Sequence, residues 1–286
     1  MQSLKLIECP RDAMQGIKDF IPTEQKIEYI NSLLKVGFDT VDFGSFVNPK
    51  AIPQMAHTEE VLKGLDLSQT KSKLLSIVAN KRGAESAIVF EEIDYLGYPF
   101  SVSETFQQRN TNASIEESFE RLSQIQNLCV KSNKQLVVYL SMGFGNPYGD
   151  AWSPELVAGW CARLYNNLDI RIMALSDTIG VSNDTSIRNL MTTLIPEFPK
   201  VEFGAHLHTT PDTFAEKVKA SVESGCFRLD GAMKGYGGCP MAKDDLTGNM
   251  PTESMVSWLH ENGYETGLNM EAFNFSLELS NSVFPH

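Results

Sequence analysis

Short apolar runs alternate with amphipathic helical stretches along nearly the whole chain. Eight of these runs are predicted strands, at 4–8, 39–43, 74–79, 86–90, 136–141, 170–175, 201–208 and 227–233. Strands that alternate with helices form βαβ units and a parallel sheet. Eight such units in roughly 250 residues have the size of a (β/α)8 barrel. The pattern therefore predicts an α/β TIM barrel that fills one domain, residues 1–286, with a doubly wound open sheet as the alternative.

Local signals mark several of the helices between the strands. Ser114 and Glu117 have the spacing of a capping box ahead of an apolar stripe, and Ser153 followed by Pro154 is a typical helix start. Residues 91–112 separate the fourth predicted strand from the next helix and are expected to form a long loop. Residues 269–284 are expected to form an extra C-terminal helix after the eighth unit.

Composition narrows the class of protein. The net charge of -12 argues against a nucleic-acid-binding surface, which would be basic. No apolar run approaches the ~20 residues that cross a bilayer, and the N-terminus reads directly into a strand without a signal or transit segment. The five cysteines are widely spread, without a C-x-x-C motif, at positions 9, 129, 161, 226 and 239. Free thiols of this kind are typical of a reducing compartment, so we expect a cytoplasmic protein.

Polar residues follow nearly every predicted strand, whereas the strand interiors consist of Leu, Ile and Val. In TIM barrels the functional groups come from the carboxyl ends of the strands, which meet at one rim. The polar residues at these ends are Arg11, Asp12, Asp42, Ser45, Ser103, Glu104, Tyr139, Ser141, Asp177, His206, His208, Cys239 and Asn249. This asymmetry predicts a functional site at the rim.

His206 and His208 stand two positions apart near the end of a predicted strand. Residues i and i+2 of a strand point to the same face, so the two imidazoles should project side by side. Two imidazoles, a carboxylate and a carboxamide on one rim make a mixed nitrogen and oxygen site. Such a site suits Mg²⁺ or Mn²⁺, with Zn²⁺, Fe²⁺ or Co²⁺ as further candidates.

Each of these residues also has a structural interpretation. Asp177 followed by Thr178 reads equally well as a helix cap, and a single cysteine such as Cys239 is more often inert than reactive. A zinc hydrolase barrel also uses H-x-H, but it needs further histidines on other strands, and the remaining ones are only His57, His260 and His286. A cupin with the same motif would be all-β, unlike this chain.

Several segments, in order, resemble those of 3-hydroxy-3-methylglutaryl-CoA lyase, a member of a superfamily of metal-dependent lyase and Claisen-condensation barrels. They are "PRDAMQ", "SFVNPKAIPQM", "SIEES", "SDTIG", "HLH", "GYGGCP" and "TGN", between about residues 6 and 260. The combination of "SFVNPKAIPQM" with "GGCP" points to the lyase branch. The chain length agrees, because the condensing synthases usually carry an additional C-terminal domain.

The resemblance implies a role for each matching residue. It implies that Asp12, His206, His208 and Asn249 bind a divalent metal, that Arg11 polarises a substrate carbonyl, and that Cys239 is the catalytic thiol. Asp42, which stands where the family has a glutamate, Asp177 and Glu253 are further catalytic candidates. Gln15, Ser45 and Lys50 are candidates for substrate binding, and Lys81 and Arg82 are further cations for the phosphates of coenzyme A.

The chain departs from the family pattern at three places. Ala13 replaces the usual glycine beside Asp12, and Thr209 replaces the aspartate that usually follows H-x-H. The segment "MAKDDL" (241–246) is about one residue longer than its counterpart and places Asp244 and Asp245 where small residues are expected. The last of these changes lies in the loop that bears Cys239, so it affects the expected substrate more than the expected reaction class.

We therefore expect a divalent-metal-dependent carbon–carbon lyase that cleaves 3-hydroxy-3-methylglutaryl-CoA to acetoacetate and acetyl-CoA. A related lyase, an aldolase or a short condensing enzyme with a different 3-hydroxy acid is the alternative, and a non-catalytic acyl-CoA-binding barrel is a third hypothesis. The expected partner is an acyl-CoA thioester, with neither nucleic acid nor membrane; a homodimer is one candidate assembly.

Overall fold

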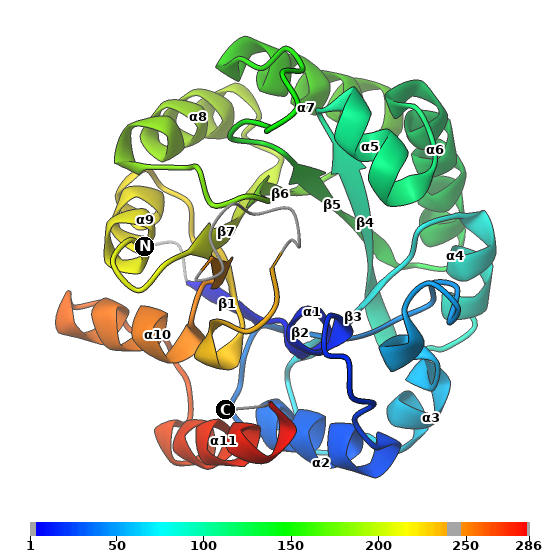
Figure 1. The fold of residues 1–286 in the computed structure, drawn as a ribbon, viewed down its shortest axis with the longest axis vertical. Helices are drawn as coiled ribbons and strands as arrows, with labels where there is room; N and C mark the ends of the chain where they lie inside the picture. The colour runs from blue at the N-terminus through cyan, green and yellow to red at the C-terminus, as the bar shows by residue number, and fades with distance from the viewer. Residues whose placement is uncertain (1–3, 239–246, 285–286) are drawn as a thin grey trace.

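Eight parallel strands close into a barrel in the computed structural model, which describes residues 4–238 and 247–284 (Figure 1). Each strand pairs with its neighbours in the chain, β8 pairs with β1, and β6 pairs with β7, so the sheet has no open edge. The strands are β1 Lys5–Glu8, β2 Thr40–Ser45, β3 Lys73–Ile77, β4 Ile93–Ser101, β5 Gln135–Ser141, β6 Ile172–Asp177, β7 Glu202–Thr209 and β8 Arg228–Gly231. The predicted TIM barrel is confirmed, and the open sheet is excluded.

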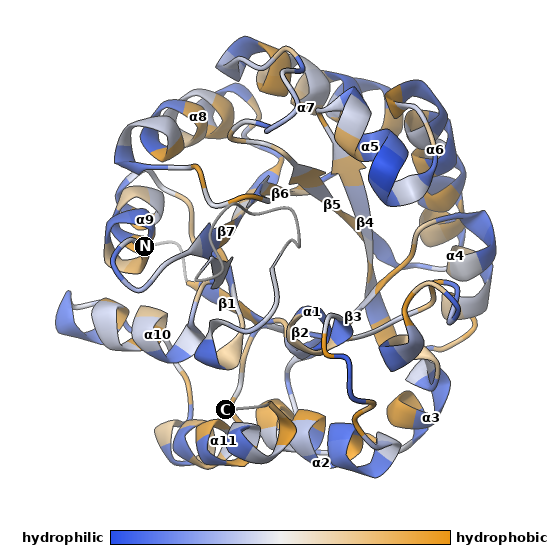
Figure 2. Cartoon of the chain, in the orientation of Figure 1, coloured by the Kyte–Doolittle hydropathy of each residue, from blue (hydrophilic) through white to orange (hydrophobic). Residues whose placement is uncertain are grey.

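Helices surround the barrel on all sides. They are α1 Pro10–Gln15, α2 Thr23–Leu34, α3 Thr58–Lys63, α4 Lys81–Ala87, α5 Glu104–Thr111, α6 Ile115–Lys131, α7 Pro154–Leu168, α8 Asp184–Glu197, α9 Phe214–Glu223, α10 Thr252–Glu261 and α11 Met270–Val283. Two short 3-10 turns, η1 Pro53–Met55 and η2 Met233–Gly235, and the short strand β9 Gly248–Asn249 complete the described elements. Hydrophilic residues lie mainly on the outward helix faces in Figure 2. Within the described residues, no helix is both long and apolar enough to cross a bilayer.

The helix starts read from the sequence are confirmed. Ser114 and Glu117 form the reciprocal capping box at the start of α6. The Ser153 side chain accepts a hydrogen bond from the Leu156 N–H at the start of α7. Pro154 follows in the first turn, where its lack of an N–H leaves no donor unpaired. The C-terminal helix α11 packs beside α2, with Phe273 against Phe38.

The predicted fourth strand was wrong. Residues 86–90 lie at the end of α4 and in the turn after it, where Val89 is 71% exposed. The fourth strand is instead β4, inside the segment expected to be a loop, and α5 follows it. Gly97 and Pro99 obscured this strand because both residues are unfavourable in sheets. Gly97 packs closely there, since a Cβ would come within 2.5 Å of the Ile77 Cδ1 and that side chain would have to shift.

Two apolar cores flank the sheet. The larger one fills the ring between strands and helices, and a smaller one inside the barrel comprises Leu75, Ile77, Tyr95, Val137, Tyr139, Ile172 and Ala174. The interior near β7 and β8 is charged instead. Arg228 is buried there, donates to Glu202 at 3.0 Å and lies two residues from Asp230. The apolar residues close one side of the barrel interior and leave the other to charged side chains.

Glu8, at the end of β1, is completely buried and connects three elements. It accepts hydrogen bonds from the Met233 N–H at 2.8 Å and from the Thr252 hydroxyl at 2.6 Å. Burial, only partly offset by these two hydrogen bonds, raises the pKa of Glu8 to about 8. The folded protein therefore holds this proton far more tightly than the unfolded chain, whose glutamates have a pKa of about 4.3.

We expect Glu8→Gln to flatten the pH dependence of stability. With a folded pKa above the unfolded one, Glu8 makes the free energy of unfolding fall as pH rises from about 4.3 towards 8. The neutral amide removes this loss, so the variant should gain about 3–4 kcal/mol relative to wild type between pH 5 and pH 8. Urea unfolding across this range is the measurement. Glu120→Gln on the exposed face of α6 is the control, and parallel wild-type and variant curves would contradict the assignment.

Candidate active site

Side chains from both ends of the chain meet at the carboxyl rim of the barrel. Arg11 and Asp12 lie on α1, which begins directly after β1 because Pro10 at its first turn favours a helix start. His206 and His208 project from β7. Asn249 lies on β9, which pairs antiparallel with β7 and sets Asn249 opposite His208. The rim site predicted from the sequence is therefore assembled from α1, β7 and β9.

Asp12, His206 and His208 form a potential metal-binding cluster. One ligand atom from each lies within 4.8 Å of the others, and the two imidazole rings are 5.8 Å apart. The Asn249 amide nitrogen donates to Asp12 at 2.7 Å and to the Tyr236 carbonyl at 2.8 Å. Because the nitrogen is engaged, the amide oxygen is the atom of Asn249 that remains for an ion.

The electrostatics of the cluster favour cation binding. Burial and the neighbouring His206 lower the pKa of His208 to about 4, so its ring is neutral at physiological pH. Burial alone would raise the pKa of Asp12, but Arg11 and the two histidines outweigh it and lower the pKa to about 2. His208 and Asp12 thus offer a neutral imidazole and an ionised carboxylate, the protonation states that a metal requires. Burial acts to lower the pKa of His206, but Asp230 and Asp12 outweigh it and raise this pKa, so an ion that binds there displaces a proton.

Arg11 connects the cluster to Asp42. Its Nε and Nη2 donate to Asp42 at 2.9 and 2.5 Å, and its Nη1 donates to Asp12 at 2.8 Å and Gln15 at 3.0 Å. Burial raises the pKa of Asp42 to about 6, although Arg11 acts in the opposite direction. Four of the five guanidinium N–H groups are used within the described residues, so one Nη2–H remains for a ligand.

A cleft of about 260 Å³ opens above the cluster. Arg11, Asp12, Gln15, His206 and His208 line its polar side, together with Ser141. Apolar residues form the opposite wall, namely Val47, Ile52, Ile77, Ala79, Pro99 and Phe106. A hollow of about 410 Å³ between α7 and α8 is larger, but it contains neither of the metal-ligand clusters found in the described residues. The cleft over Asp12 is therefore the candidate active site.

The loop after β8 passes close to the cluster. Gly237 has φ +90°, and a Cβ there would lie 2.5 Å from the Asn249 amide nitrogen and 2.8 Å from the Asp12 carbonyl oxygen. Only glycine fits this approach. Gly238 lines the cleft. Cys239, Asp244 and Asp245 follow in the chain and lie outside the described residues.

Several predicted site residues do not face the cleft. Asp177 is buried and accepts hydrogen bonds from Lys217 at 2.7 Å and from the Ser182 hydroxyl at 2.5 Å. It does not cap the next helix, because Asn183 is the N-cap of α8. Ser45 donates to the Ile77 carbonyl on the next strand. Glu253 accepts from the Lys234 N–H at the start of α10. Lys50 is exposed in the turn after β2 and is absent from the cleft lining.

The structure also brings in residues that sequence reasoning missed. Asn110 and Thr111 at the end of α5 line the cleft, and they were overlooked because this segment was expected to be a loop. Asp230 lies on β8 and contacts His206. Arg228-x-Asp230 in a buried strand is a sequence signal that could have identified it, since charged residues two apart share one strand face.

Known proteins resemble this chain in both sequence and fold. The HMGL-like family model matches residues 5–279. The chain belongs to the HMGL-like family. It is 32% identical over 273 residues to mouse mitochondrial hydroxymethylglutaryl-CoA lyase, covering 94% of this chain and 82% of that one. Together with the family match, this likeness makes the chain a carbon–carbon lyase.

Solved structures agree with this assignment to the HMGL-like family. The HMG-CoA lyase of Brucella melitensis has a TM-score of 0.91 and 30% identity, with 99% of each chain covered. An HMG-CoA lyase from Acinetobacter baumannii in complex with coenzyme A and 3-methylmalate has a TM-score of 0.89 and 28% identity, with 98% of this chain and 91% of that one covered. The barrel of the HMGL-like chain thus matches these lyases over nearly its full length.

Proposed function

We propose that the protein cleaves 3-hydroxy-3-methylglutaryl-CoA to acetoacetate and acetyl-CoA with the help of a divalent metal. The observation that carries the proposal is the convergence of Asp12, His206 and His208 beside Arg11 at the mouth of one cleft. The relatives named above support the substrate, since their names and the coenzyme A complex refer to the same class of thioester.

The residues present fit a divalent ion. Asp12 and Asp42 carry more negative charge than Arg11 balances, and the buried Nδ1 of His208 has no hydrogen-bond partner among the described residues. Asp12, His206, His208 and Asn249 would hold the ion, with Mg²⁺ or Mn²⁺ preferred and Zn²⁺, Fe²⁺ or Co²⁺ as alternatives. When bound, such an ion lowers the pKa of a substrate hydroxyl and fixes its orientation.

In this reaction a base takes the proton of the tertiary hydroxyl, the C2–C3 bond breaks, and the electron pair passes to the thioester as an enolate. We assign the free Nη2–H of Arg11 to the developing enolate oxygen, where a fixed cation is most effective. Asp42 holds the guanidinium in place through two hydrogen bonds. Of the groups that we considered as the base, Asp12 and the histidines face the cleft, whereas Asp42 and Asp177 do not.

The remaining assignments follow the family resemblance. Cys239 is proposed as the acid that protonates the enolate carbon, and its place directly after the cleft-lining Gly238 supports this role. Gln15, in contact with Arg11 and Asp12, is proposed to bind substrate. The described cysteines are free thiols, which supports a reducing compartment such as the cytoplasm. A homodimer remains a prediction.

A second candidate substrate is a related 3-hydroxyacyl-CoA with a larger apolar group at C3. The cleft residues Val47, Ile52, Ile77 and Pro99 favour it, because they offer apolar surface to an alkyl group. This alternative keeps the reaction class and the metal site and changes only the acyl group.

The test is turnover of the purified, metal-free protein after Mg²⁺ or Mn²⁺ is added. Acetoacetate and acetyl-CoA should appear in equal amounts from 3-hydroxy-3-methylglutaryl-CoA, and a chelator should abolish both. A homologue with a longer C3 alkyl group, assayed in parallel, decides between the two acyl groups. Metal-independent cleavage, or formation of a 2-substituted malate from acetyl-CoA and a 2-oxo acid, would contradict the proposal.

A further inference from the structure

We propose that Asp230 is a positioning residue, which fixes the tautomer and the direction of the His206 ring and thereby sets the affinity of the site for its metal. This inference rests on the metal site of the proposed function and deepens it. Asp230 is part of no ligand set assigned above, and it reaches the site only through His206.

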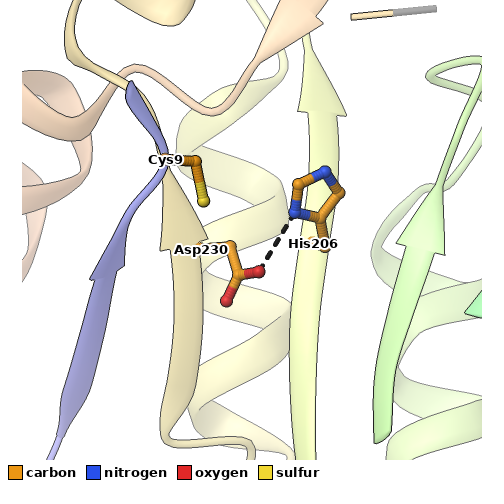
Figure 3. A group of neighbouring side chains, drawn as sticks. All are labelled: Cys9, His206 and Asp230. Carbon is orange, nitrogen blue, oxygen red and sulfur yellow. Dashed lines mark hydrogen bonds and ion pairs between the residues drawn. The ribbon is translucent and has the colours of Figure 1, made fainter. Parts of the chain in front are cut away.

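The contact between Asp230 and His206 crosses two neighbouring strands. The Asp230 Oδ2 lies 3.1 Å from the Nδ1 of His206, and Asp230 is only 3% exposed (Figure 3). A carboxylate can only accept, so the contact places the ring proton on Nδ1. Figure 3 shows the other ring nitrogen on the far side of the imidazole from Asp230. With Nδ1 engaged by Asp230, Nε2 is the ring nitrogen left to bind an ion together with Asp12 and His208.

Charges beneath the site keep Asp230 suited to this role. Arg228, two residues earlier on the same face of β8, is buried and is held by Glu202 at 3.0 Å. The buried Arg228 cation thus lies between the carboxylates of Glu202 and Asp230, and Asp230 in turn contacts His206. Packing alone does not explain charged side chains at these positions, because other interior residues of the barrel, such as Val137 and Ile172, are apolar.

The second oxygen of Asp230 indicates that the carboxylate is not there to complete a hydrogen-bond network. Its Oδ1 is buried and has no partner among the described residues. An unsatisfied buried acceptor costs free energy of about 1–3 kcal/mol. An apolar residue would avoid this cost, so we attribute the carboxylate to its action on His206, as the carboxylate partners of metal-bound histidines act in other proteins.

Cys9 provides a rival explanation. Ligand atoms of Cys9, His206 and Asp230 lie within 4.8 Å of one another, so the three could hold an ion directly. Two observations weigh against it. Asp230 already engages the Nδ1 that would have to bind the ion, and burial together with the surrounding carboxylates raises the pKa of the Cys9 thiol, which must ionise to bind metal.

The test compares metal binding by wild type, Asp230→Ala, Asp230→Asn and the control Cys9→Ser, which alters the same cluster without touching the hydrogen bond. Competition with a chromophoric chelator for Mn²⁺ or Co²⁺ gives the affinity. Asp230→Ala should bind at least about tenfold more weakly, and up to 100-fold, whereas Cys9→Ser should match wild type. Asp230→Asn keeps an acceptor oxygen but loses the charge, so its metal affinity should fall less than that of Asp230→Ala. If Asp230→Ala does not fold, the metal affinity of Asp230→Asn is the deciding measurement.

A second readout reports the tautomer itself. At alkaline pH, where the His206 ring is neutral, the ¹⁵N resonances of the metal-free protein should show His206 protonated at Nδ1 in wild type and a mixture of tautomers in the variant that folds. Variants of Asp230 that bind metal within about twofold of wild type, with an unchanged tautomer, would overturn the inference. A thiolate-to-cobalt absorption that disappears in Cys9→Ser would overturn the inference, because it would show that Cys9, His206 and Asp230 bind the ion directly. Wild type that binds no metal would reject the proposed metal site itself.

Discussion

His208→Ala should lose bound divalent metal and nearly all turnover while the barrel remains folded. His208 is buried beside His206 and Asp12, and its low pKa keeps the ring neutral and ready to bind a cation. The variant lacks one of the four proposed ligands, so the site is incomplete. In the proposed mechanism the metal acidifies the substrate hydroxyl, and we therefore expect turnover to fall by at least about 10³-fold. Metal content by elemental analysis and turnover with added Mn²⁺ are the measurements.

The control for this prediction is His260→Ala, which removes an exposed histidine of α10 whose ring nitrogen pairs with Thr266. It should keep both metal and turnover. Circular dichroism and thermal melts establish that each variant is folded. An inactive His208→Ala enzyme with full metal occupancy would refute the ligand assignment and make His208 a group that acts on the substrate.

Arg11→Met should reduce kcat by about 10²–10³-fold while largely preserving metal binding. The guanidinium is assigned to the enolate oxygen, and that charge develops only as the C2–C3 bond breaks. Methionine retains the length of the buried chain but provides no donor. The loss should therefore appear in kcat and kcat/KM together, since an interaction made only in the transition state affects both. Steady-state kinetics with metal at saturation is the measurement.

Arg163→Met is the matched control, because Arg163 forms an ion pair with Glu116 on the surface, away from the cleft. Arg11→Lys adds a second comparison: it keeps the charge but cannot maintain the two hydrogen bonds to Asp42, so it should recover only part of the activity. If Arg11→Met raises KM at unchanged kcat, Arg11 binds substrate uniformly and our catalytic assignment is wrong.

The regular alternation of strands and helices made most of the fold predictable. Seven of the eight strands were predicted within a few residues because their apolar runs are continuous, as expected for strands buried on both faces. The fourth failed because β4 contains Gly97 and Pro99, whereas the apolar end of α4 imitated a strand. The close contact of Gly97 with the Ile77 side chain depends on tertiary packing, which a local sequence pattern does not reveal.

The site residues were predictable where the proposed ligands lie at strand ends. They were less predictable where a side chain could point either into the cleft or towards another buried partner. His206 and His208 share a face because strand geometry requires it. Asp177 follows a strand as well, but Lys217 from α9 captures its carboxylate, and the sequence separation of 40 residues conceals that pair. Asp230 was missed for a different reason: it lies within its strand, and the pairing of β8 with β7 brings it against His206.

The position of Asn249 has a consequence for how the protein responds to its ligand. Asn249 and Asp12 are hydrogen-bonded although 237 residues separate them, so an ion held by both would tie the last barrel segment to the first. An unfolded chain cannot maintain that tie, and occupancy therefore becomes part of the folding equilibrium. At 100 times the dissociation constant, loading would add about 2.7 kcal/mol to the free energy of unfolding. The melting temperature should then rise with the logarithm of metal concentration, as though the chain carried a reversible cross-link whose strength is set by the supply of metal.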